Sequence, residues 1–456
     1  MASYDIDIVV HSNECLELGK DVNLVVGIPY GNRMAMPFAH KGLFVKNSEQ
    51  YDLFIYGEDD ILITETNIKA FCEVTTILPQ TEIAGFFRFE RDQTGKRYYP
   101  DVFHSFHFDP TSVRTRKGLV FAQFTNEHAG CYMLTQSQLK KAIETGGYNL
   151  KLRSGPYTIA CTASTDPYKH CHMEKVLCIS RFEEFLVHHQ PNKFIGKAGI
   201  GHEEFAEQLS GIKELASSKG KGKHLFQIRT SLEKTNWWNK SYFETCTQEL
   251  TESIANGSRT VLSVGCGYGV WESELIKRGI KLVGVPLDSI IRRVTEKKGI
   301  EVTDPDFNAA RAQLTGRTFD CIVFINILHH LKFPSHVLRS FVSMLAENGR
   351  VIVTTPNFHH VSLLGMRLGL SRKRSPRFIH PIAEDARRMG EFQKSGLHLV
   401  TRSVLNKWFR QSGLLPQEIR YRCDGIYEKA NHLTRCVFGK LLGHEILGIA
   451  GRRVSF

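Results

Sequence analysis

The stretch VLSVGCGYG, Val261 to Gly269, decides the fold class of the second half of this chain. It begins with apolar residues, as a buried strand does, and it ends in a turn rich in glycine. Glycine lets the backbone turn tightly and approach a ligand just before a helix begins. The pattern therefore predicts a strand–turn–helix unit that binds a nucleoside cofactor, and an ordinary turn of a doubly wound sheet is the alternative.

Strands and helices alternate on both sides of this turn. Apolar runs of strand length are followed by stretches with the apolar spacing of a helix, and turn residues separate them. This alternation is typical of an α/β domain with a parallel sheet. The expected strands are 259–265, 281–287, 319–326 and 349–356, and the expected helices include 270–279 and 334–347.

As an ordered set, these segments resemble the class I methyltransferases, which bind S-adenosylmethionine. VLSVGCGYG is similar to the first motif of that family, FDCIVFINILHHL (319–331) to its fourth strand and the following loop, and LVTRSVLNKWFRQSGLLPQEIRY (399–421) to a late helix and strand. The resemblance covers roughly Asn236 to the end of the sequence and implies a Rossmann-like domain, which we place at residues 229–456. It also implies that the turn contacts the cofactor through Gly265, Cys266, Gly267 and Gly269.

Two positions depart from this family. Its members usually carry an acidic residue two positions before the first glycine of the turn, where this chain has Ser263. They usually carry another at the end of the second strand, where this chain has Pro286. We expect Asp288, two positions later, to accept hydrogen bonds from the ribose hydroxyls instead. The alternative is that Asp288 caps the helix that begins at SIIRRV.

The resemblance also assigns residues to the adenine and to the reacting centre. Asp304 and Asp306 stand where the third strand of the family delivers a side chain to the adenine; Asp306 is the expected contact, and both residues also suit a turn. Asn326 ends the fourth strand and is expected to contact the cofactor. His329 and His330 follow it, and one of them is expected to act as general base, with a role as wall residues as the alternative.

In the first half, YDLFIYGEDDILIT (51–64) places Glu58, Asp59 and Asp60 at the end of an apolar strand. Adjacent carboxylates repel one another unless a cation lies between them, so the motif predicts a metal site, with a solvated acidic turn as the alternative. Residues 5–197 resemble glycosyltransferases of the GT-A fold, whose acidic motif holds Mn²⁺ or Mg²⁺ against a nucleotide-sugar donor. The resemblance implies that Asp59 and Asp60 bind the metal, completed by His188 or His189.

The same resemblance supplies candidate catalytic residues in this half. Glu127 or His128 lies in the segment similar to the acceptor side of GT-A enzymes, and Asp166 is an alternative base. The acidic motif begins already at residue 58, which is early for such an enzyme. A domain that binds carbohydrate without catalysis is therefore a second interpretation.

Residues 201–228 join the two halves. A polar helical stretch (202–218) runs into KGKGKH (219–224), where glycine and lysine disfavour packing, so the expected domains are 1–200 and 229–456 with a linker between them. No secretory signal and no run of about 18 apolar residues is present, and no two of the 11 cysteines form a C-x-x-C pair. We expect a cytoplasmic protein with reduced thiols.

The positive charge is concentrated in the second half. Residues 1–200 hold 21 Lys and Arg against 23 Asp and Glu (−2), and the remainder holds 38 against 24 (+14), which gives the total of +12. This asymmetry indicates an anionic partner, with solubilising charge as the alternative. The basic stretch GLSRKRSPRFIHP (369–381) is expected to hold a phosphate-bearing acceptor or to be a solvated loop.

Together, these features predict a bifunctional carbohydrate-modifying enzyme. A metal-dependent module of GT-A type is followed by a methyltransferase that modifies a hydroxyl or carboxylate of a glycan or other sugar-bearing acceptor, lipid- or phosphate-linked in some forms. The alternatives are a methyltransferase with a non-catalytic carbohydrate-binding domain and a nucleic-acid methyltransferase. The absence of an Asn/Asp-Pro-Pro-Tyr/Phe motif disfavours the nucleic-acid alternative.

Overall fold

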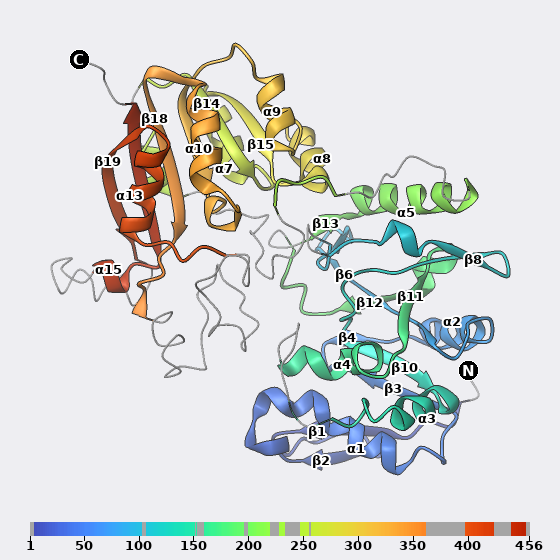
Figure 1. Ribbon diagram of the computed structural model, residues 1–456. Helices are drawn as coiled ribbons and strands as arrows, with labels where there is room; N and C mark the ends of the chain where they lie inside the picture. Colours follow the sequence, from blue (N-terminus) through green and yellow to red (C-terminus); the bar gives the residue numbers. More distant parts are fainter. Residues whose placement is uncertain are drawn as a thin grey trace. The chain divides into compact units, whose positions relative to one another are not determined.

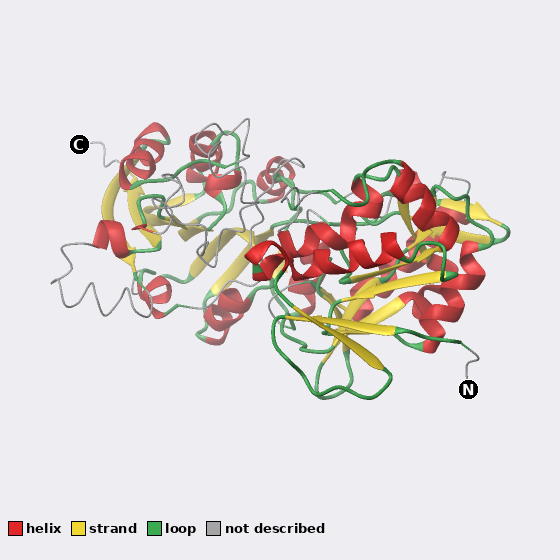
Figure 2. Cartoon of the chain, turned by 90° about the horizontal axis from the view of Figure 1, so that it is seen from below, coloured by secondary structure: helices red, strands yellow, loops and turns green. Residues whose placement is uncertain are grey.

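The computed structural model describes residues 4–102, 106–150, 152, 159–195, 199–218, 228–232, 247–254, 257–361, 397–423 and 439–452. These residues form two compact units, one that ends before residue 228 and one that begins there. Helices and strands are interleaved in both units (Figure 2). None of the described helices is both long and apolar enough to cross a lipid bilayer.

The second unit is built on a seven-stranded sheet with the order β16-β15-β14-β17-β18-β20-β19 (Figure 1). The first five of these strands along the chain are parallel, and β20 enters antiparallel between β18 and β19. The strands are β14 (Thr260–Cys266), β15 (Lys281–Pro286), β16 (Glu301–Val302), β17 (Phe319–Ile325), β18 (Leu345–Pro356), β19 (Leu414–Arg422) and β20 (Glu445–Arg452).

The helices of this unit connect its strands as an α/β fold requires. They are α6 (Gln248–Glu252), α7 (Val270–Lys277), α8 (Ser289–Lys297), α9 (Phe307–Gln313), α10 (Pro334–Val342), α13 (Arg402–Gln411) and α15 (Gly439–Leu442). The expected Rossmann-like α/β arrangement is thus confirmed. One boundary differs, because the expected helix 334–347 ends at Val342, and Leu345 already belongs to β18, where it pairs with Phe319.

The apolar part of the stretch Val261–Gly269 forms the centre of this sheet. Strand β14 lies between β15 and β17, and its residues from Val261 to Cys266 are buried. A strand covered on both faces must be apolar or small along its whole length, which explains the continuous run VLSVGC. Helix α7 begins directly after Gly269, so the expected strand–turn–helix unit is present.

The first unit also contains both helices and strands, and its strands form several smaller sheets. Its strand orders are β1-β2, β10-β3, β5-β11-β9-β8 and β13-β7-β6-β12-β4. The strands are β1 (Ile8–Ser12), β2 (Val22–Val26), β3 (Leu53–Gly57), β4 (Ile61–Leu62), β5 (Glu82–Ala84), β6 (Phe87–Arg91), β7 (Arg97–Tyr99), β8 (Arg114–Arg116), β9 (Leu119–Ala122), β10 (Cys131–Thr135), β11 (Glu174–Cys178), β12 (Leu186–His189) and β13 (Ile200–Gly201).

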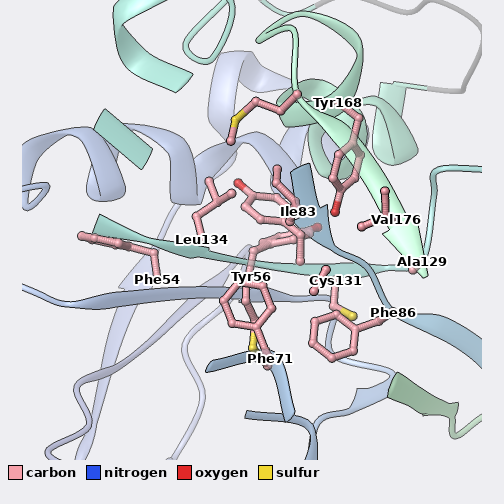
Figure 3. Packing of buried hydrophobic residues seen from close by; sticks show 14 of the residues in the cluster. Phe54, Tyr56, Phe71, Ile83, Phe86, Ala129, Cys131, Leu134, Tyr168 and Val176 are labelled. Atoms are coloured by element: carbon pink, nitrogen blue, oxygen red, sulfur yellow. The ribbon is translucent and has the colours of Figure 1, made fainter. Parts of the chain in front are cut away.

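Aromatic side chains dominate the core of the first unit. Tyr56, Phe71 and Phe86 pack with aliphatic residues from β5, β10 and β11 (Figure 3). The described helices of this unit are α1 (Ala39–Lys46), α2 (Glu65–Thr75), α3 (Gln136–Glu144), α4 (Ile159–Lys169) and α5 (His202–Ser217).

Helix α5 belongs to the first unit rather than to a linker. Phe205 is fully buried, and its ring lies 4.0 Å from that of Tyr99 and 5.1 Å from that of Phe87, both on strands of that unit. The expected linker at 201–228 therefore contains a packed helix. The glycine and lysine stretch at 219–224 and the basic stretch at 369–381 lie outside the described residues.

Candidate cofactor site and acidic cluster

The glycine turn after β14 has little room for side chains. Gly265 and Gly269 have φ values of 75° and 71°, which residues with a Cβ rarely adopt. A Cβ at Gly265 would lie 2.7 Å from Cγ1 of Ile327. The Thr295 hydroxyl donates to the Gly267 carbonyl (3.1 Å), and the Lys298 ammonium donates to the Tyr268 carbonyl (2.6 Å). Two carbonyl groups of the turn thus accept hydrogen bonds from side chains at the end of α8.

A buried carboxylate lies beside this turn. The Ser263 hydroxyl donates to Oε1 of Glu272 at 2.7 Å, and both side chains are almost completely buried. Glu272 stands in the first turn of α7, where a negative charge is favoured by the helix dipole. The sequence shows that an acid is missing at position 263, but no motif draws attention to Glu272.

The three candidate aspartates after β15 and β16 have structural roles. Asp288 is fully buried, and its Oδ1 accepts from the backbone amides of Ile290 and Ile291, so it caps α8. Asp306 caps α9 in the same way. Asp304 accepts from the Asp306 amide and pairs with Arg229 at 2.6 Å. The structure thus shows the capping alternative for Asp288 and a cap for Asp306, and their cofactor contacts stay predictions.

A polar network lies where β17 ends. Asn326 has a positive φ of 48°, and its side-chain amide donates to Oε1 of Glu445 at 2.9 Å. The other carboxylate oxygen of Glu445 pairs with Arg422 at 2.9 Å. Sequence reasoning missed Glu445 and Arg422, because strands far apart in the chain bring them together.

The two candidate histidines lie next to that network. Their ring centres are 4.1 Å apart, and each side chain is only 2% exposed. Nδ1 of His329 lies 3.5 Å from the hydroxyl of Thr355, which stands near the end of β18. Such burial is typical of wall residues, and the role of either histidine as a base stays a prediction.

The acidic motif of the first unit meets His189. Oδ2 of Asp60 lies 3.1 Å from Nε2 of His189, and Nδ1 of the same ring lies 2.6 Å from Oε1 of the buried Glu90. His188, the other expected metal ligand, instead contacts Asn192 at 3.1 Å. Of the two histidines, the structure thus places His189 rather than His188 beside Asp60, because neighbouring residues of β12 point to opposite faces, and metal binding by either stays a prediction.

The metal set expected from the sequence is not assembled around Asp60. Asp59 is exposed, whereas Asp60 is half-buried. Among the described residues, no three histidine, cysteine, aspartate or glutamate side chains form a group that could hold a metal ion by themselves. The contact between Asp60 and His189 is therefore the part of the expected site that the fold brings together.

Glu58 has a different partner from Asp60. Its Oε1 lies 3.3 Å from Nε2 of His128. Burial disfavours the charged form of His128, but hydrogen bonds with Cys161 and Glu58 outweigh burial and raise the pKa of His128 to about 9. Burial likewise opposes ionisation of Glu58, and the hydrogen bond with His128 nevertheless lowers the pKa of that carboxyl below its usual value.

The remaining candidates of this unit are held in ion pairs. Glu127 pairs with Lys169 at 2.8 Å. Asp166 is 0% exposed and pairs with the equally buried Lys41. A carboxylate in this environment is inaccessible to an acceptor, so the position of Asp166 does not support its expected role as a base.

Comparisons with known proteins identify the second unit. A family model described as a methyltransferase domain matches residues 238–418. The ubiquinone biosynthesis O-methyltransferase of Pseudomonas fluorescens is 26% identical over 177 residues, which cover 37% of this chain and 70% of that protein. The enzyme of the same name from Pseudomonas putida is 26% identical over 179 residues with the same coverage.

Solved structures give a more distant likeness. An S-adenosylmethionine-dependent methyltransferase from Mesorhizobium loti is 15% identical, with a TM-score of 0.33 and coverage of 46% of this chain and 98% of that chain. The match to the family model covers the glycine turn and the strands β14 to β18, together with the first half of β19. The carboxy-terminal region of this chain is therefore a class I S-adenosylmethionine-dependent methyltransferase domain.

Proposed function

We propose that the methyltransferase unit methylates an oxygen atom of a sugar-bearing acceptor, a hydroxyl or a carboxylate. The glycine turn between β14 and α7 carries this proposal, because it leaves backbone open to a cofactor at the carboxyl end of the central strand. The curated relatives are named O-methyltransferases, which supports oxygen as the methylated atom.

The residues of the turn suit one end of S-adenosylmethionine better than the other. The buried carboxylate of Glu272 suits the ammonium group of the methionine end. At the ribose end, β15 ends in Pro286, and Asp288 is used as a helix cap. We therefore expect ribose recognition to rely on backbone groups of the turn more than on a dedicated carboxylate.

The cofactor supplies a methyl group that its sulfonium already activates, so the chain has mainly to align the acceptor oxygen and exclude water. His329 and His330 form a buried wall at the end of β17. In this proposal, one of these imidazoles takes the proton of the acceptor hydroxyl, which leaves the oxygen able to attack.

We further propose that the first unit is a metal-dependent module that binds a nucleotide sugar. The proximity of Asp60 and His189 at 3.1 Å carries this proposal, because the carboxylate is a ligand suited to Mn²⁺ or Mg²⁺ and the imidazole nitrogen beside it could complete a Mn²⁺ site. Glu90 orients the imidazole through its other nitrogen. The diphosphate of the donor would complete the coordination.

Calorimetric titration of UDP in the presence of Mn²⁺ tests the module. We expect binding that needs Mn²⁺ and is lost in Asp60→Asn and His189→Gln, whereas Glu144→Gln, an exposed acid at the end of α3, binds as the wild type does. Binding of an oligosaccharide without UDP or Mn²⁺ would instead support the non-catalytic carbohydrate-binding alternative.

The curated relatives are named ubiquinone biosynthesis O-methyltransferases, which favours a second acceptor class, a hydroxyl of a quinone-related compound. Release of S-adenosylhomocysteine should be measured with a panel of sugars, uronic acids and catechols. Turnover with sugars or uronic acids alone supports the main proposal, and turnover with catechols alone would replace it.

A further inference from the structure

We infer that Glu272 supplies the carboxylate that binds the ammonium group at the methionine end of the cofactor, in place of the acid that is missing at Ser263. This inference rests on the assignment of S-adenosylmethionine to the glycine turn. Its physical basis is a buried charge next to that turn for which the described part of the protein offers only one hydrogen bond.

The surroundings of Glu272 leave its charge only partly satisfied. The side chain is 2% exposed, and Oε1 accepts from the Ser263 hydroxyl at 2.7 Å. Within the described residues, Oε2 accepts no hydrogen bond and the carboxylate forms no ion pair. An ionised carboxylate without a counter-charge is costly to bury, so a cationic ligand at this position would stabilise the folded unit.

Lys298, a basic group that the charge of Glu272 affects, does not replace such a ligand. The negative charge of Glu272 favours a higher pKa of Lys298, but burial has the larger effect and lowers the pKa of this lysine below its usual value. Its ammonium donates to the Tyr268 carbonyl on the glycine turn. Lys298 therefore closes the turn rather than neutralising Glu272.

The position of Glu272 in the fold is fixed by its neighbours. Helix α7 follows β14 through the glycine turn (Figure 1), and Glu272 is its third residue. The indole of the adjacent Trp271 is fully buried and donates to the Thr251 hydroxyl at 3.2 Å, which anchors this end of the helix. The Ser263 hydroxyl then orients the carboxylate from the central strand. A helix residue and a strand residue thus share the role of one acid.

Two ligands separate this role from a general effect on the fold. S-adenosylhomocysteine carries the ammonium group, whereas 5′-methylthioadenosine has the same adenosine and sulfur but lacks the amino-acid end. We expect Glu272→Gln to weaken the binding of S-adenosylhomocysteine by about tenfold or more, because one charge-assisted hydrogen bond is lost. The affinity for 5′-methylthioadenosine should stay within about twofold of that of the wild type.

Three further variants complete the experiment. Ser263→Asp in the Glu272→Gln background should restore the affinity for S-adenosylhomocysteine, because the acid returns from the strand. Ser263→Ala keeps the charge but removes its orienting hydroxyl, so it should give a smaller loss that is again specific to S-adenosylhomocysteine. Glu274→Gln, on the same helix but paired with Lys277 at the surface, should bind both ligands as the wild type does.

The outcomes distinguish this inference from the cofactor assignment. If wild type binds S-adenosylhomocysteine and Glu272→Gln binds it equally well, or loses both ligands to the same extent, the inference is wrong while the assignment stands. If Glu272→Gln does not fold, equal effects of Ser263→Ala on both ligands would overturn it. Wild type that binds neither ligand would refute the cofactor assignment and the inference with it.

Discussion

Gly269 shows how a single residue shapes the cofactor turn. Its φ of 71° strains any residue with a Cβ, and a Cβ would also overlap the Ile300 side chain. We expect Gly269→Ala to lower the free energy of unfolding by about 1–3 kcal/mol and to weaken S-adenosylhomocysteine binding, as measured by urea denaturation and calorimetry.

Gly279 provides the matched control for this substitution. It also has a positive φ, of 81°, but a Cβ at that position would meet no atom within 4 Å. Gly279→Ala should therefore show the backbone strain alone and leave the affinity unchanged. Equal losses of affinity in both variants would contradict a specific role of the turn.

The pKa of His128, which hydrogen bonds with Cys161 and Glu58 raise, makes stability depend on pH. The pKa of His128 is raised from 6.5 to about 9, so between these values the folded protein binds more protons than the unfolded chain. This contribution, about 3 kcal/mol at most, is complete below pH 6.5 and is lost as the pH rises through 9.

Thermal unfolding of wild type and His128→Gln in the presence of EDTA measures this effect. The advantage of wild type in melting temperature should shrink between pH 6.5 and 9. An advantage that is constant over this range, or that grows with pH, would contradict the raised pKa.

For single residues, the sequence predicted residue types better than side-chain positions. The glycines of the turn are set by backbone conformation, which local sequence reveals. The choice between His188 and His189 depends on which face of β12 is turned toward Asp60, and adjacent residues of a strand alternate between faces. Glu272 escaped notice because its importance depends on contact with Ser263, nine positions earlier, rather than on a motif.

Helix α8 illustrates the scale of secondary-structure elements. Asp288 caps it through two backbone amides, and asparagine caps helices about as well as aspartate does. Asp288→Ala should therefore cost about 1 kcal/mol of stability, whereas Asp288→Asn should be nearly neutral, as measured by urea denaturation.

The same pair of variants tests the expected ribose contact of Asp288. If Asp288 serves only as a cap, Asp288→Asn binds S-adenosylhomocysteine as tightly as wild type does. A clear loss of affinity in Asp288→Asn, without a loss of stability, would instead establish the ribose role.

Elements with a strong apolar period were predictable, and their ends were less so. The buried run VLSVGC could only be a central strand once the alternation around it was recognised. The segment after Val342 has the composition of a helix end, but pairing between Leu345 and Phe319 extends β18 there. Long-range pairing of this kind overrides local preference.

For the whole molecule, the sequence predicted two domains joined by a helix and a linker, but it did not predict that α5 packs in the first unit. Its polar surface suggested a linker, yet Phe205 packs against Phe87 and Tyr99 on strands of the first unit. We expect Phe205→Ala to destabilise that unit by about 3–5 kcal/mol and to leave the affinity for S-adenosylhomocysteine unchanged.

Thermal unfolding and calorimetric titration of the same variant check this expectation, with Ser210→Ala, exposed on the same helix, as the control. A loss of S-adenosylhomocysteine affinity in Phe205→Ala would contradict this expectation and show that cofactor binding depends on α5.

The identity of the second unit depends on its binding of the cofactor at the glycine turn. Isothermal titration of the full chain with S-adenosylhomocysteine measures this directly. We predict saturable binding of about one ligand per chain in wild type, as expected for one specific site, and none in Gly267→Trp, whose indole would fill the turn. Absence of binding to wild type, or equal binding to Gly267→Trp, would contradict the assignment.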